Sequence, residues 1–259
     1  FRSDDIARIR AGHPGLPEAR VILMAMLHHL DLGVGRVVDT LRAEGLWDNT
    51  LLFFLTDNGG SRAMSANNAP LRGFKTQNYE GGIRTPFIVS WPARFRGGRT
   101  IASPVSSLDI LPAVLEAAGV TPPADRPLDG RSLLPLLTGN TTVHRENFFW
   151  SEGGSAGGWA VRSGDWKLVT QRTQTKPELF NLAADPGETK DLAAAEPARV
   201  AALARLYETW LDGMAEPMHG GGKRYAPSPS AAGKAGKDQR REQKQKARDE
   251  RRAKEKSER

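Results

Sequence analysis

The sequence predicts an α/β domain that is followed by a smaller α+β unit. From residue 17 to residue 118, helical and strand-like segments alternate, which is typical of a sheet covered by helices. Four short strand-like runs and a helix come next, an order that favours an antiparallel meander with a helix packed on it. The chain has 259 residues, of which 39% are hydrophobic, so it is long and apolar enough to bury a core.

The first predicted element is a long helix from Pro17 to Glu44. Pro17 suits a first helical position, and Gly45 is a natural stop. Apolar residues recur at three- and four-residue spacing, as they do on the buried face of a helix. That face consists of Ile22, Met26, Leu30, Val34, Val37 and Leu41.

Two strands and a second helix complete the first unit. Residues 50–55 (Thr-Leu-Leu-Phe-Phe-Leu) are apolar on both faces, which suits a central parallel strand covered by helices. Residues 86–91 resemble a second buried strand, and residues 107–118 form a helix that ends at Gly119. This order favours an α/β sheet.

The second unit is expected to be a meander with one helix. Strand-like runs occupy residues 147–151, 159–162, 166–170 and 178–182. A predicted helix from Pro197 to Met214 would pack on this sheet through Val200, Leu203, Leu206, Tyr207, Trp210 and Leu211. We therefore expect an α/β unit over residues 1–125, an α+β unit over residues 126–219 and a disordered basic tail over residues 220–259.

The net charge of +7 is concentrated in that tail. Residues 223–259 contain 14 basic and 6 acidic residues, which leaves 23 basic and 24 acidic residues in the rest of the chain. The excess of basic over acidic residues therefore says little about which ligand the folded part binds. Nucleic acid is not an expected partner, although a non-catalytic protein whose tail binds a polyanion stays an alternative.

Two negative observations narrow the possible functions. The chain has no cysteine, which excludes disulfides and thiolate metal sites within it. No apolar run approaches the roughly 18 residues that a membrane span needs, so no membrane span is expected.

The strongest local candidate for a site follows the strand at residues 50–55. At the carboxyl end of this strand, where ligands bind in open α/β sheets, stand residues 56–60 (Thr-Asp-Asn-Gly-Gly). Asp57 and Asn58 offer hard oxygen donors that suit Ca²⁺ or Mg²⁺, but the same residues are also common in turns that bind nothing. Asp4 and Asp5 could add carboxylates, but we interpret them as solvated.

An ordered series of motifs resembles the sulfatase family, within the alkaline phosphatase-like fold. The first three are Thr-Asp-Asn-Gly at residues 56–59, Pro-Leu-Arg-Gly-Phe-Lys at residues 70–75 and Tyr-Glu-Gly-Gly-Ile-Arg-Thr-Pro-Phe-Ile at residues 79–88. The likeness continues through residues 104–112, 128–135, 164–168 and 178–188. It covers about residues 5 to 214, the part that lies downstream of the nucleophile in this family.

The resemblance implies roles for three residues. Asp57 and Asn58 match two ligands of a single Ca²⁺ ion, with Mg²⁺ as the other option, and Lys75 matches the lysine that binds the substrate's sulfate. One departure is Phe74, which stands where the family usually has glycine. Glu80 and Arg84 are expected to stabilise the loop by salt bridges.

The family's nucleophile is not found in this sequence. It is a formylglycine made from Cys or Ser in a Cys/Ser-x-Pro-x-Arg motif upstream of the Asp-Asn pair. Ser90-Trp91-Pro92-Ala93-Arg94 matches the pattern, but it follows the metal ligands, so we reject it. None of the five histidines matches a family proton donor. Because the chain begins at Phe1, we interpret it as a fragment that is inactive alone.

The resemblance implies that the whole enzyme hydrolyses sulfate esters of carbohydrates or aryl alcohols. Relatives are commonly periplasmic or secreted, but the chain itself gives no location. A phosphate or phosphonate ester hydrolase of the same superfamily is the main alternative, although Asn58 favours the one-metal branch over sites with two zinc ions. Trp150 and Trp159 are expected to contact the leaving group.

Overall fold

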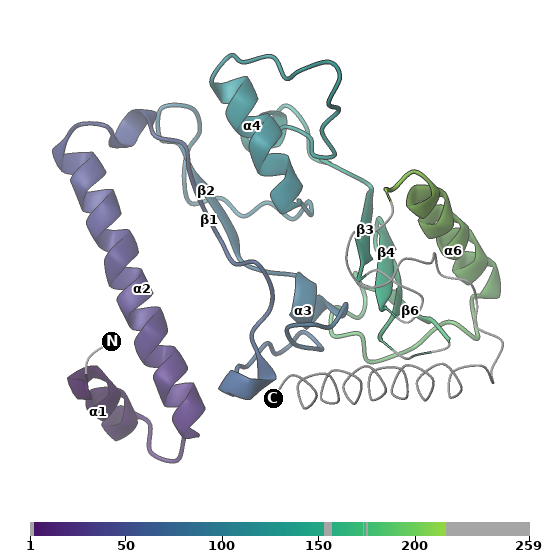
Figure 1. The fold of residues 1–259 in the computed structure, drawn as a ribbon, viewed down its shortest axis with the longest axis horizontal. Helices are drawn as coiled ribbons and strands as arrows, with labels where there is room; N and C mark the ends of the chain where they lie inside the picture. Colours follow the sequence, from purple (N-terminus) through teal and green to yellow (C-terminus); the bar gives the residue numbers. More distant parts are fainter. Residues whose placement is uncertain (1–2, 153–156, 173, 175, 216–259) are drawn as a thin grey trace, which may run out of the picture.

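The computed structural model describes residues 3–152, 157–172, 174 and 176–215. Figure 1 shows helices α1 and α2 on one side, the β1–β2 pair in the middle and the β3–β6 sheet with helix α6 on the other side. The basic tail lies outside the described residues, and the unit boundaries at residues 125 and 219 stay predictions.

Helix α2 (Glu18–Ala43) is the predicted long helix, but its predicted apolar face is mostly uncovered in the described part of the chain. Its buried residues are Val21 and Ala25, which pack against Ile9 of helix α1 (Ser3–Gly12). Met26 and Leu30 are instead 46% and 52% exposed. The apolar spacing predicted the helix correctly, but few residues of the described part of the chain pack on its apolar face.

The same helix corrects the expectation about membrane spans. Within the described residues, α2 is the one helix long and apolar enough to cross a membrane by length and composition. The apolar run is hard to see in the sequence because His28, His29, Asp31 and Arg36 interrupt it. A helix in the core of a larger domain meets the same criteria, so this finding alone assigns no membrane role.

Strands β1 (Leu52–Leu55) and β2 (Phe87–Ser90) pair with each other in antiparallel register. The expectation of a central parallel strand is therefore not met within the described residues. Both strands are only partly buried, and Ile88 is 55% exposed. One side of the pair packs on a cluster that includes Trp91, Ala113 and Leu133.

The remaining elements of the first unit are short. They are η1 (Trp47–Asn49), η2 (Arg62–Met64), α3 (Glu80–Ile83), η3 (Ser107–Asp109), α4 (Ile110–Ala117) and α5 (Leu134–Leu137). The predicted helix at 107–118 is thus a 3₁₀ turn that continues into α4. Asp109 is fully buried and accepts hydrogen bonds from the backbone N–H groups of Ser106 and Arg131, at 2.8 and 2.9 Å.

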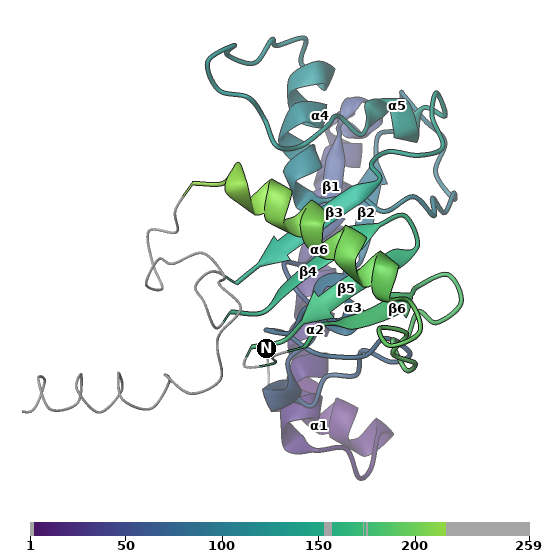
Figure 2. The ribbon, with the colours of Figure 1, turned by 90° about the vertical axis from the view of Figure 1, so that its right-hand side faces the viewer.

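The predicted meander is confirmed. Strands β3 (Asn147–Ser151), β4 (Trp159–Ser163), β5 (Trp166–Thr170) and β6 (Glu178–Asn181) form one antiparallel sheet in chain order. Helix α6 (Pro197–Asp212) lies across this sheet (Figure 2). Leu203 and Tyr207 are its most buried residues, and the other predicted contact residues pack around them.

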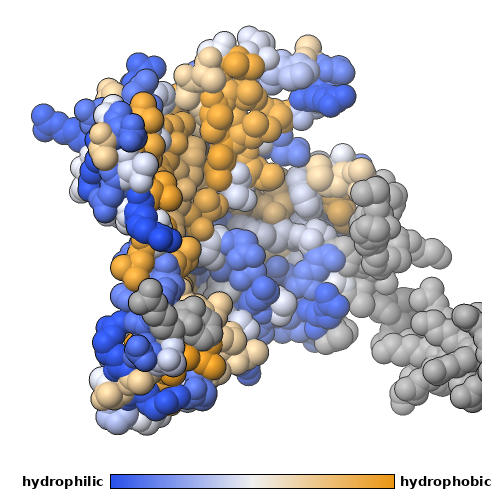
Figure 3. All heavy atoms as spheres, turned by 60° about the vertical axis from the view of Figure 1, so that its left-hand side comes forward, coloured by the Kyte–Doolittle hydropathy of each residue, from blue (hydrophilic) through white to orange (hydrophobic). Residues whose placement is uncertain are grey.

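Apolar side chains gather on one face of the molecule, as Figure 3 shows in orange. Exposed large hydrophobic residues come from α2, β2, η3 and α4, and include Met26, Leu27, Leu30, Ile88, Leu108 and Leu111. Burial of apolar surface is the main force that stabilises a fold, so such a face is typical of one that another polypeptide segment covers.

Candidate functional site

The Asp-Asn turn begins directly after β1. The Thr56 hydroxyl donates to the backbone carbonyl of Asn58 at 2.6 Å, and the Asn58 amide nitrogen donates to the carbonyl of Gly59 at 2.9 Å. These bonds fix the turn and leave the Asn58 amide oxygen as the acceptor of that side chain. The Asp57 carboxyl group is exposed to solvent.

The loop that contains Lys75 lies beside this turn. The backbone N–H of Lys75 donates to the carbonyl of Gly60 at 3.1 Å. The Asn68 side chain joins the same two segments, because its amide donates to the carbonyls of Gly60 and Gly73 and its oxygen accepts from the Gly60 N–H. The structure thus brings the segments of all three candidate residues together, and the Lys75 side chain is exposed.

Glycines make this close approach possible. A Cβ atom on Gly59 would lie 1.8 Å from the carbonyl oxygen of Gly81, and one on Gly82 would lie 2.0 Å from that of Gln77. Side chains at these positions would force the Asp-Asn turn, the Lys75 loop and α3 apart. The glycine-rich motifs therefore serve the packing of backbone against backbone.

Phe74 does not block the loop. Its ring is partly buried and lies under the guanidinium group of Arg62, 4.8 Å from ring centroid to Cζ. The backbone N–H of Phe74 donates to the Gln77 side chain at 3.0 Å. The departure from the family pattern therefore adds a contact to the nearby 3₁₀ turn η2.

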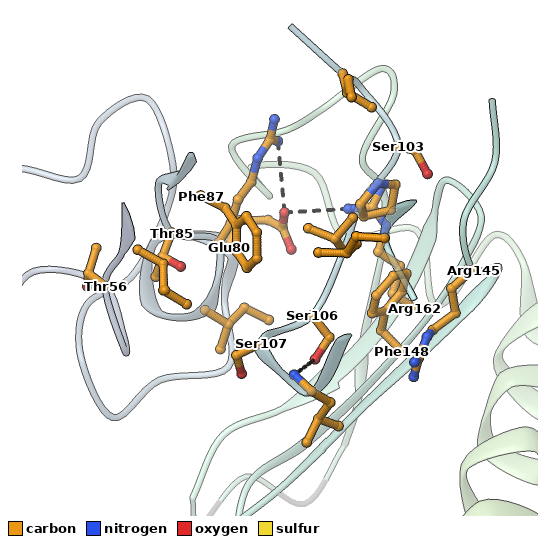
Figure 4. Close-up of a pocket in the computed structure, with 18 of the residues that line it drawn as sticks. Thr56, Glu80, Thr85, Phe87, Ser103, Ser106, Ser107, Arg145, Phe148 and Arg162 are labelled. Carbon is orange, nitrogen blue, oxygen red and sulfur yellow. Dashed lines mark hydrogen bonds and ion pairs between the residues drawn. The ribbon is translucent and has the colours of Figure 1, made fainter. Parts of the chain in front are cut away.

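The turn opens into a large groove (Figure 4). Its lining includes Asp57 and Asn58 of the turn and, from the β3–β6 sheet, Phe148, Trp150 and Arg162. The groove has a volume of about 1700 Å³. It is large enough for a substrate together with further protein segments.

One of the two predicted leaving-group contacts is wrong. Trp159 is only 6% exposed and stacks on Tyr207 of α6, with ring centroids 4.4 Å apart. It belongs to the core between sheet and helix, because it sits on the sheet face that α6 covers. Trp150 lines the groove and stacks on Phe148 at 6.2 Å, so it stays a candidate.

The described residues do not by themselves form a complete metal site. They contain no group of three or more His, Cys, Asp or Glu side chains placed to bind a metal ion. Asp57 and Asn58 supply two oxygen donors, whereas Ca²⁺ takes about six to eight. The donor chemistry fits a hard divalent cation, and the other ligands would come from elsewhere.

Asp5 is not simply solvated, contrary to the sequence interpretation. It lies in α1, and its carboxylate is 2.8 Å from the Nε2 atom of His29 in α2. The hydrogen bond to His29, followed by that to Arg8, lowers the pKa of Asp5. The pair links two helices and lies apart from the Asp-Asn turn in the fold.

A buried ionic cluster behind the Lys75 loop was not expected from the sequence. Lys167 is fully buried and lies 2.9 Å from both the Glu80 and the Glu188 carboxylates. Burial raises the pKa of Glu188, and the Lys167 charge opposes that rise. Salt bridging by Glu80 was predicted. Its partners Lys167 and Glu188 were not predicted, because in the sequence they are only charged residues without an assigned role in two of the motifs.

A second contact of the loop with the sheet involves Tyr79. The Tyr79 hydroxyl donates to the Glu178 carboxylate, and the Arg72 guanidinium lies over the Tyr79 ring, 3.9 Å from its centroid. Burial, together with the hydrogen bond to Glu178, raises the pKa of Tyr79 to about 12. The loop is thus joined to the β3–β6 sheet at several points.

Comparison with protein families gives two matches. A family described as Sulfatase matches residues 24–120, and one described as N-sulphoglucosamine sulphohydrolase, C-terminal, matches residues 74–209. Steryl-sulfatase of Mus musculus is 33% identical over 209 residues, which cover 66% of this chain and 34% of that protein. The chain therefore spans about a third of the length of this relative.

Solved structures give the same result. The structure of Ps i-CgsB in complex with k-i-k-neocarrahexaose has a TM-score of 0.74 and 29% identity, covering 81% of this chain and 46% of its own. A phosphonate monoester hydrolase of Agrobacterium radiobacter has a TM-score of 0.58 and 25% identity, covering 74% of this chain and 41% of its own. The fold is that of the alkaline phosphatase-like hydrolases. Within that class, the chain belongs to the sulfatase family.

Proposed function

We propose that the complete protein is a sulfatase that hydrolyses sulfate esters, and that this chain supplies the distal part of its active site. The observation that carries the proposal is the hydrogen bond between Lys75 and Gly60, because it holds a lysine loop beside an Asp-Asn turn at the end of a strand. The family matches and the order of the motifs support it.

Each residue has a definite part in the proposed chemistry. Asp57 and Asn58 would hold a divalent cation, Ca²⁺ by family resemblance, which would supply positive charge next to the sulfate group. The Lys75 ammonium group would bind a sulfate oxygen and stabilise the negative charge that develops as the ester bond breaks. The nucleophile, a formylglycine by the same resemblance, would come from outside this chain.

The exposed apolar face supports a larger catalytic domain. Large apolar side chains of α2, β2 and α4 are about half exposed here, and the chain covers 34% of the mouse relative. We infer that the rest of the catalytic domain packs on this face and completes the groove beside Asp57. The chain alone should therefore be inactive.

Sulfated carbohydrates are the proposed substrate class. The neighbour Ps i-CgsB was solved with k-i-k-neocarrahexaose, and another neighbour, BT4656, was solved with D-glucosamine-2-N,6-O-disulfate. The groove that Asp57 and Asn58 line is also lined by Trp150 and Arg162. An aromatic ring and a guanidinium group suit a sugar ring and its anionic substituents.

A phosphonate or phosphate ester hydrolase is the second candidate, because phosphonate monoester hydrolases share the fold. The deciding experiment compares hydrolysis of 4-nitrophenyl sulfate, phosphate and phenylphosphonate by the complete protein. We expect the highest kcat/KM for the sulfate ester. A preference for the phosphonate would replace the proposal by the second candidate. No hydrolysis of these esters or of a sulfated oligosaccharide would favour a non-catalytic binding protein.

A further inference from the structure

Three motifs that the proposed chemistry leaves without a role meet at one buried point. Glu80 begins α3, Lys167 lies on β5 and Glu188 follows the Asp185-Pro186-Gly187 turn. Their side chains are 2% exposed for Glu80 and fully buried for Lys167 and Glu188. Charged groups are rarely buried so completely, because removing them from water costs free energy unless they are paired with opposite charges.

The geometry of the cluster is specific. The Lys167 ammonium group donates to Glu80 Oε1 at 2.9 Å and lies 2.9 Å from Glu188 Oε1. The other oxygen of Glu188 accepts the backbone N–H of Glu80 at 2.6 Å. Lys167 therefore holds two carboxylates, and one of these binds the first peptide N–H of α3.

The cluster controls where α3 lies, and α3 contacts the candidate site directly. The Gly82 carbonyl accepts the N–H of Gly59 at 2.8 Å, and the Gly81 N–H donates to the carbonyl of Arg72 at 2.6 Å. The first of these bonds fixes the Asp-Asn turn, and the second fixes the loop that leads to Lys75. A shift of Glu80 would be passed to both segments through backbone contacts that leave no free space.

Two arginines on the groove side complete the cluster. Arg162 and Arg84 lie 3.9 and 4.0 Å from Glu80 Oε2 (Figure 4). Glu80 thus has the buried ammonium group on one oxygen and two guanidinium groups on the other. This arrangement fixes the rotation of the carboxylate as well as its position.

We propose that Lys167 is a positioning residue, which through Glu80 and Glu188 holds α3, and with it the sulfate-binding loop of Lys75, in place. This inference rests on the proposed function, because it assigns sulfate binding to Lys75. Lys167 itself is buried behind the loop and touches no substrate. Its role is to set the geometry of groups that do.

The test uses the complete protein with three variants. Lys167→Met removes the charge and keeps the length, Lys167→Arg restores the charge, and Glu188→Gln weakens the cluster without leaving two unpaired carboxylates. Arg10→Met, which removes a surface ion pair with Glu18 at 2.8 Å, is the control. The readouts are KM and kcat for 4-nitrophenyl sulfate, the inhibition constant of inorganic sulfate, and amide hydrogen exchange.

We expect Lys167→Met to raise both KM and the inhibition constant of sulfate roughly tenfold or more. If this variant does not fold, the same increase is expected of Glu188→Gln. Lys167→Arg should recover most of this loss. Exchange should become faster at residues 72–83 and stay unchanged in α6. Unchanged KM and sulfate inhibition in a folded variant with lowered thermal stability would overturn the inference, because the cluster would then only stabilise the fold.

The same design separates this inference from the proposed function. If the unmodified protein hydrolyses no sulfate ester, the proposed function fails and hydrogen exchange alone decides the positioning relationship. Faster exchange confined to residues 72–83 would support it. Faster exchange that is equal in α6 and in the loop would contradict it.

Discussion

The backbone N–H of Gly59 donates to the carbonyl oxygen of Gly82 across 2.8 Å and joins the Asp-Asn turn to α3. The turn ends a strand of the first unit, whereas α3 is held by the β3–β6 sheet through Glu80 and Lys167. The candidate metal ligands therefore depend on contacts from both units.

Gly59→Ala should destabilise the protein and impair the site. Its Cβ would lie 1.8 Å from the Gly81 oxygen, so the turn and α3 must separate. We expect a loss of more than about 2 kcal/mol in the free energy of unfolding. Gly35→Ala is the matched control: it lies in α2 on the side of Asp31 and Asp39, away from the apolar face, with no described atom within 4 Å of the added methyl group, so it should stabilise by up to about 1 kcal/mol. Equal effects of the two substitutions in urea unfolding would contradict the packing argument.

Lys75→Ala in the complete protein should lower kcat/KM for a sulfate ester by about 10² to 10³, because a positive charge at the transferred group is lost. Lys75→Arg should recover part of the activity. Lys190→Ala, at another exposed lysine, should have no effect. Steady-state kinetics check this, and wild-type activity in Lys75→Ala would remove the residue from the site.

Trp150 and Trp159 should respond differently to substitution. Trp159→Ala should cost about 3–5 kcal/mol, because the ring is buried against Tyr207. Trp150→Ala should change the ranking of sulfated sugars and aryl sulfates more than it changes stability, since this ring lines the groove. Thermal unfolding and a substrate panel test both. An unchanged ranking in the Trp150 variant would exclude contact with the leaving group.

Stability should depend on pH through Asp185. Its carboxylate accepts the N–H groups of Thr189 and Lys190 at 2.7 and 2.9 Å, and the Lys190 bond is the main cause of its lowered pKa. A lowered pKa in the folded state gives stability that is present above the ordinary value of 3.8 and is lost as the pH falls through the folded value.

Asp185→Asn should therefore lower the free energy of unfolding at about pH 7. The loss should be less than about 1 kcal/mol, because the carboxyl group is close to solvent, and it should be smaller still at about pH 3. Urea unfolding at both values measures the difference. Asp48→Asn, an exposed aspartate on η1, is the control. A destabilisation by Asp185→Asn that grows as the pH falls would have the wrong sign.

Much of the fold follows from local patterns. The meander and α6 could be predicted because alternation and helical spacing are read within each segment, and Leu203 and Tyr207 lie on the predicted face. The packing of α2 could not be predicted, because a periodic pattern indicates that a face is apolar but does not say what covers it. The pairing of β1 with β2 shows the same limit, since apolar strands give no direction of pairing.

Part of the candidate site could likewise be predicted from the sequence. Asp57, Asn58 and Lys75 stand in recognisable motifs, and their segments do lie together. The cluster around Lys167 could not be predicted, because Glu80 and Glu188 are separated by 108 positions and a buried ion pair leaves no periodic signal. The burial of Trp159 depends likewise on a distant helix.

We propose that the Asp-Asn turn binds a metal ion for sulfate-ester hydrolysis. The most direct measurement is the metal content of the purified complete protein, compared with that of Asp57→Ala, Asn58→Ala and the control Asp48→Ala, together with the hydrolysis of 4-nitrophenyl sulfate. We predict about one calcium ion per wild-type or control chain, with loss of both the ion and the activity in the Asp57 and Asn58 variants. Full metal content and activity in the Asp57 and Asn58 variants would exclude these residues as metal ligands.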